Sequence, residues 1–143
     1  MEAFVKNFFS VLHREHLKPR GYTKERFTFS RDAGEFVERV QFQGSQWNSA
    51  GEPWQFYINV GVQFKDLPPR SPDRDFPRTH AWSRIENIVP GIPAKYQVSP
   101  TTVAALASEL NTLLAQASAS VSALASPARA KCATGKYASL GAT

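Results

Sequence analysis

A stretch of strict alternation, WQFYINVGVQF at residues 54–64, constrains the fold of this chain more than any other feature of its sequence. Every even position is apolar, whereas the odd positions hold polar side chains, Tyr57 or glycine. Successive side chains of a β-strand point to opposite faces of its sheet, so the pattern predicts a strand with one buried and one wetter face. Such strands are typical of antiparallel sheets, whose apolar face needs cover from other elements.

Two shorter stretches predict a hairpin that joins the same sheet. Residues 26–31 alternate, with Phe27 and Phe29 on one face, and an Asp-Ala-Gly turn leads into residues 35–43. Glu38 shares the apolar face of the second stretch, and we expect its carboxylate to reach water because it stands near the start of that strand.

Helices are predicted at both ends of the chain. Residues 2–17 and residues 99–126 repeat apolar side chains at helical spacing, and Pro127 is expected to end the second helix. Short strands at residues 82–89 and 94–98 connect the sheet with that helix. We therefore expect an α+β fold in two layers: an N-terminal helix, an antiparallel sheet of three to five strands and a long C-terminal helix.

The predicted C-terminal helix is poor in charge, because Glu109 is its single charged residue. We expect its apolar stripe to pack inside the chain. The alternative is that the helix forms an interface, including a homodimer made through this helix.

The length of 143 residues suits one α+β domain, expected over residues 1–126 and followed by a flexible basic tail at 127–143. Cys132 is the single cysteine, which excludes an intrachain disulfide and fits a reducing compartment. The N-terminus lacks the pattern of a secretion signal, and no stretch of about twenty residues is apolar enough to span a bilayer. The sequence therefore predicts a cytoplasmic protein that does not associate with a membrane.

No catalytic, cofactor or metal motif stands out. Cys132 lies in the predicted tail without an evident base, and the Thr134-Gly135-Lys136-Tyr137 segment lacks the glycine spacing and the Ser or Thr of a phosphate loop. His13 and His16 are neighbours on a helix, but His80 is the only other histidine, and zinc needs three or four ligands. We expect no metal and no cofactor, and the balance is against an enzyme.

One constellation remains, on the polar face of the predicted sheet. It combines amides, hydroxyls, a guanidinium and a phenol on Thr28, Ser30, Arg39, Gln41, Gln43, Tyr57, Asn59 and Gln63. Such groups bind polar ligands, peptides or nucleic-acid strands, although an ordinary solvated sheet face remains the simpler interpretation. Gly61 is expected to leave a hole beside Asn59 and Tyr57 that admits a ligand.

Short motifs over about residues 4–98 resemble the bacterial domain of unknown function 4304. They are Lys18-Pro19-Arg20-Gly21-Tyr22, Phe29-Ser30-Arg31, Gln43-Gly44-Ser45, the strand at residues 56–62, and His80 with Arg84. The resemblance implies a bacterial cytosolic protein and marks Gln43, Ser45, Asn59 and Arg84 for testing, without assigning them a role. This chain lacks a tryptophan pair that the family often has near Lys95, and its Ala/Ser-rich end does not align.

These observations lead to three functional hypotheses. The first is a non-enzymatic module that binds another protein, for instance an immunity-type protein that neutralises a toxin. The second is nucleic-acid binding, favoured by the net charge of +5 and by Arg39, Arg70, Arg74, Arg78, Arg84 and Tyr57. The third is an enzyme that acts on a small polar substrate through Tyr57, Arg84 and His80. The candidate ligand-binding residues are Arg39, Gln41, Gln43, Ser45, Tyr57, Asn59 and Arg84.

Overall fold

The computed structural model describes residues 2–49, 51–69, 76, 78–134 and 139–140. Six antiparallel strands form one sheet: β1 (Thr23–Glu25), β2 (Thr28–Asp32), β3 (Phe36–Gly44), β4 (Trp54–Phe64), β5 (Ala81–Arg84) and β6 (Tyr96–Val98). The first five follow one another in the order β1-β2-β3-β4-β5, while β6 pairs with the start of β4. The predicted hairpin and long strand are therefore confirmed.

The sheet contains one strand more than the three to five that the sequence predicts. The additional strand is β1, which lies at the edge of the sheet. All three residues of β1 are exposed, so its sequence carries no alternation between buried and polar positions. The stretch expected as a strand at 82–89 divides instead, since β5 ends at Arg84 and the short 3-10 helix η3 (Ile85–Asn87) follows.

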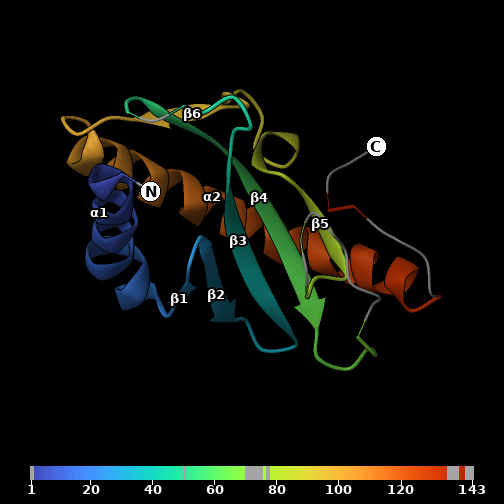
Figure 1. Cartoon of the computed structure of the whole chain (residues 1–143). Helices are drawn as coiled ribbons and strands as arrows, with labels where there is room; N and C mark the ends of the chain where they lie inside the picture. Colours follow the sequence, from blue (N-terminus) through green and yellow to red (C-terminus); the bar gives the residue numbers. More distant parts are fainter. Residues whose placement is uncertain (1, 50, 70–75, 77, 135–138, 141–143) are drawn as a thin grey trace.

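Two long helical segments lie against one face of the sheet (Figure 1). The N-terminal segment consists of α1 (Ala3–Val11), the π-helical turn η1 (Leu12–Leu17) and the 3-10 turn η2 (Lys18–Arg20). It ends at Gly21, whose φ of 91° is in the left-handed region that favours glycine. The C-terminal helix α2 (Val103–Cys132) runs behind the sheet. The expected α+β architecture in two layers is confirmed.

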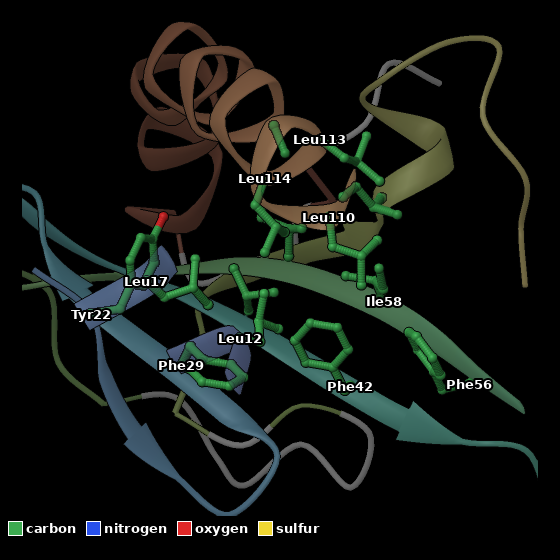
Figure 2. Packing of buried hydrophobic residues seen from close by; sticks show 14 of the residues in the cluster. Leu12, Leu17, Tyr22, Phe29, Phe42, Phe56, Ile58, Leu110, Leu113 and Leu114 are labelled. Atoms are coloured by element: carbon green, nitrogen blue, oxygen red, sulfur yellow. The ribbon is translucent and has the colours of Figure 1, made fainter. Parts of the chain in front are cut away.

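The core lies between the sheet and these helices. Figure 2 shows Phe29, Phe42, Phe56 and Ile58 of the sheet facing Leu12, Leu17, Leu110, Leu113 and Leu114 of the helical layer. The apolar stripe of α2 packs inside its own chain, as expected, since its leucines and valines are nearly all buried.

The C-terminal helix does not end before Pro127, contrary to the expectation. It continues to Cys132 with Pro127 inside it, although an internal proline costs roughly 3 kcal/mol through a lost hydrogen bond and a steric clash. Ala125 and Ala128, on either side of Pro127, are both buried. Farther on, Leu140 is buried and its N–H donates to Ser83 Oγ at 3.0 Å, so part of the predicted flexible tail packs on the sheet. Residues 135–138 and 141–143 of that tail lie outside the described residues.

Glu38 is buried and does not reach water, contrary to the expectation. Its side chain is 2% exposed between the sheet and α2. Oε2 accepts hydrogen bonds from the Tyr22 hydroxyl at 3.0 Å, Arg31 Nη2 at 2.8 Å and the Ser118 hydroxyl at 3.1 Å. Burial raises the pKa of Tyr22 to about 12, and the Glu38 charge acts in the same direction.

Candidate functional site

The polar sheet face is the side of the sheet opposite α1 and α2. We define it by Thr28, Ser30, Arg39, Gln41, Gln43, Tyr57, Asn59, Gln63 and Arg84, which occupy alternate positions of β2, β3, β4 and β5. The register places Gln41, Asn59 and Arg84 side by side on three neighbouring strands. Strand pairing thus assembles five of the seven candidate residues (Gln41, Gln43, Tyr57, Asn59 and Arg84) in one patch.

Asn59 is at the centre of a hydrogen-bonded network in this patch. Its Nδ2 donates to Gln41 Oε1 at 2.8 Å and to Gln43 Oε1 at 3.0 Å. Arg84 Nη1 donates to Asn59 Oδ1 at 3.0 Å and to Gln43 Oε1 at 3.1 Å. Asn59 is fully buried, whereas Gln43 is exposed and Arg84 is half-buried. A buried amide therefore orients a guanidinium that solvent reaches.

Two cations lie against the ring of Tyr57. The Arg84 guanidinium carbon is 4.4 Å from the ring centre, and Lys95 Nζ is 5.6 Å from it. Such cation–π contacts are attractive because the face of an aromatic ring carries negative charge density. Among the described residues, neither Arg84 nor Lys95 forms an ion pair with a carboxylate. The patch therefore presents fixed positive charge.

Arg39 belongs to the same face but ties strands together rather than facing solvent. It is 8% exposed, and it donates from Nη1 to Ser30 Oγ at 2.8 Å and from Nη2 to Gln63 Oε1 at 2.5 Å. Burial lowers the pKa of Arg39, and the nearby charge of Arg78 lowers it further. Its donors are committed to neighbours within the protein, so we assign it a structural role.

The hole expected beside Gly61 is filled. A Cβ on Gly61 would lie 2.9 Å from Thr79 Cγ2 and 3.1 Å from the Ala81 carbonyl oxygen. Glycine is required here because the segment before β5 packs directly on the strand. The polar sheet face is consequently covered at Gly61, whereas Arg84, Tyr57 and Gln43 remain accessible to solvent.

Ser45 lies apart from the network and shapes the loop between β3 and β4. Its hydroxyl accepts the Trp47 N–H at 3.2 Å, and its own N–H donates to the Gln55 carbonyl at 2.9 Å. The Asn48 side chain also binds both backbone groups of Gln55, at 2.7 and 2.8 Å. The part of the loop at residues 45–48 displays Trp47, which is 77% exposed and was missed by sequence reasoning. A tryptophan within a run of Gly, Ser, Asn and Gln was the available signal.

A pocket of about 480 Å³ lies at the β1 end of the polar sheet face. Arg26 and Arg78 both line it, and both have positive φ angles, of 56° and 63°. Non-glycine residues with such angles are uncommon and are frequently found at functional sites. Arg78 pairs with Glu25 at 3.1 Å, while Gln41 and Gln43 connect the pocket with the Asn59 network. Arg70 and Arg74 lie outside the described residues.

His80 is held by two backbone groups. Its Nδ1 accepts the Phe64 N–H at 2.9 Å, so the proton of the neutral ring is on Nε2, which donates to the Pro68 carbonyl at 2.8 Å. Both nitrogens thus have structural partners. Among the described residues, no group of three or more His, Cys, Asp or Glu side chains could hold a metal ion, and no helix is long and apolar enough to cross a membrane.

These features define a small α+β protein with one helix-covered sheet face and one polar face. Residues 13–121 match the family described as Domain of unknown function (DUF4304), and the chain belongs to this family. The match extends beyond the motifs noted at residues 4–98, since it includes α2 as far as Val121. Searches of the curated proteins and of the solved structures found no match.

Proposed function

We propose that this protein is a non-enzymatic binding module that takes another protein on its polar sheet face. The observation that carries the proposal is that the Arg84 guanidinium is positioned but has no carboxylate partner among the described residues. Buried Asn59 accepts a hydrogen bond from it, and it lies on the ring of Tyr57. Arg, Tyr and Trp carry much of the binding energy at protein interfaces. Exposed Trp47 is displayed by the loop that joins the two central strands of this face.

The arrangement favours a partner with an acidic side chain. A guanidinium has five N–H donors, and the two contacts of Arg84 use Nη1, so further donors remain for a carboxylate. Because the side chain is already positioned, binding costs little additional conformational entropy. The net charge of +5 further attracts an acidic partner. An immunity-type protein that covers an acidic surface of a toxin is one concrete form of this function.

The two alternatives have weaker support. Tyr57 would have to release Arg84 before a nucleic-acid base could stack on that side of the ring, and Arg39 is buried. An enzyme that used His80 would have to break its bonds to Phe64 and Pro68. The proposal needs no metal or cofactor.

We propose a cytoplasmic location, in keeping with the single cysteine.

The proposal does not include a homodimer formed through α2. The apolar stripe of α2 is already used in the core of its own chain. A measured mass of two chains in solution would show that the helix also serves an interface.

The test is a native pull-down from cells that express the protein, at low and at moderate salt, with mass spectrometry and nucleic-acid staining of the eluate. We expect a stoichiometric protein that survives moderate salt and is lost with Arg84→Ala and Tyr57→Ala. Arg14→Ala is the matched control, since Arg14 is exposed on the N-terminal helical segment. Recovery of nucleic acid alone, or equal capture by all variants, would refute the proposal.

A further inference from the structure

A second pocket, of about 460 Å³, lies between α1 and the edge strand β1. Its lining comes from one side of α1 and from the β1–β2 turn: Lys6, Phe9, Ser10, Lys24, Arg26 and Phe27. It shares Arg26 and Phe27 with the pocket on the polar sheet face but lies on the helix side of the sheet. It is therefore separate from the site proposed above.

The floor of this α1–β1 pocket is aromatic. The ring centres of Phe9 and Phe27 are 5.0 Å apart, and both rings contact Trp54, at 5.7 and 6.1 Å. Phe9 is 2% exposed and Phe27 is half-buried, so these rings are fixed by the core and still border open space. Such a surface accepts an apolar body.

The rim is cationic. Lys6, Lys24 and Arg26 are all exposed, and none of them forms an ion pair with a carboxylate among the described residues. Lys24 pairs in register with Phe29, a core residue, so Lys24 occupies a helix-side position of β1. Three positive charges therefore surround a mostly apolar opening.

Protection of the sheet edge explains only part of this arrangement. An inward-pointing lysine on an edge strand discourages pairing with other chains. That role does not require Lys6 on the facing helix, nor Arg26 held at a φ of 56°. The convergence of charges from two elements on one pocket points to a ligand.

We propose that the α1–β1 pocket binds an organic anion with an aryl or acyl body. The body rests on Phe9 and Phe27, and the carboxylate is attracted by Lys6, Lys24 and Arg26, with the Ser10 hydroxyl as a further donor. The volume is within the range of small-molecule sites, which are commonly apolar with a few polar groups that fix orientation.

Octanoate is a suitable probe, and octanamide is its uncharged counterpart. Titration of the full chain, followed by calorimetry and by amide NMR shifts, should show saturable octanoate binding with shifts centred on Phe9 and Phe27. Octanamide should bind about tenfold more weakly, and Lys24→Glu should weaken octanoate binding by a similar factor. Lys131→Glu, at the far end of α2, makes the same charge change and should leave binding within about twofold.

Lys6→Glu provides a second charge reversal on a different element, in case Lys24→Glu fails to fold. The proposal is overturned if octanoate shows no saturable binding at millimolar concentration. It is also overturned if octanamide binds equally well, or if Lys131→Glu weakens binding as much as Lys24→Glu does.

Discussion

Replacement of Glu38 by alanine gives the sharpest test of how this fold is held together. Glu38 accepts hydrogen bonds from Tyr22, Arg31 and Ser118, and its alanine variant leaves two buried hydroxyls and a largely buried guanidinium without their acceptor. Removal of one partner of a buried ion pair costs about 3–5 kcal/mol. Since a domain of this size is stable by roughly 5–15 kcal/mol, we expect a loss of at least about a fifth of the total stability.

A double replacement distinguishes the contribution of the ion pair to stability from the contribution of the packing around it. Glu38 Oε1 has no hydrogen-bond partner among the described residues, so the buried carboxylate also carries a desolvation cost. Exchange of both charged groups for apolar ones of similar size is often neutral or stabilising. We therefore expect Glu38→Leu combined with Arg31→Met to recover the part of the stability that is lost through the unpaired Arg31 charge, while the Tyr22 and Ser118 hydroxyls still lack their acceptor.

Urea unfolding monitored by circular dichroism measures both effects, provided that the slope of the transition is unchanged between variants. Glu35→Ala is the control, since Glu35 is exposed and its replacement should change stability by no more than about 0.5 kcal/mol. A cost below about 1 kcal/mol for Glu38→Ala would contradict the assignment of Glu38 and Arg31 as a buried ion pair. A double variant as unstable as the single one would contradict it too.

Three further changes have expected outcomes. The pKa of Tyr22 is raised from 10.0 in the unfolded chain to about 12 in the folded protein. The stability that the protonated Tyr22 hydroxyl contributes is therefore complete below pH 10 and is lost as the pH rises toward 12. Tyr22→Phe should flatten the fall of Tm over that interval, and equal slopes would contradict the assignment. Gly61→Val should destabilise by about 1–3 kcal/mol, because its Cβ meets Thr79 at 2.9 Å; an unchanged Tm would show that the segment before β5 yields easily. Pro127→Ala should stabilise α2 by up to about 3 kcal/mol, and a lower Tm would mean that the helix depends on this proline.

The sheet could be predicted from the sequence because apolar and polar residues alternate along its long strands, and successive side chains of a strand point to opposite faces. The apolar even positions of residues 54–64 are the buried face of β4, and the polar side chains of residues 39–43 and 55–59 meet on the other face. Their assembly with Arg84 could not be derived in the same way. β5 has four residues, too few for its alternation to specify a register against β4.

The burial of the Glu38 carboxylate could not be predicted from the residues next to it in the sequence. Glu38 stands near the start of its strand, where a charged side chain commonly remains solvated. Its partners are 7, 16 and 80 residues away, on β2, after η2 and on α2. The helix beyond Pro127 was misjudged for a related reason, since Arg129 in that part forms hydrogen bonds with Asp66, 63 residues away in the sequence.

The contact between Ser118 and Glu38 also decides where α2 lies along its own axis. A helix whose surface is mostly Ala, Ser and Leu presents nearly the same shape after a shift of one turn. A shift in one direction would place Leu114 against Glu38 and leave the carboxylate without its hydroxyl donor, at a cost of about 1–3 kcal/mol. A shift in the other direction would offer Ser122 but separate Arg129 from Asp66, with which it forms hydrogen bonds at 3.1 and 3.2 Å. Two polar contacts thus select one axial position for a helix whose apolar surface discriminates poorly between positions.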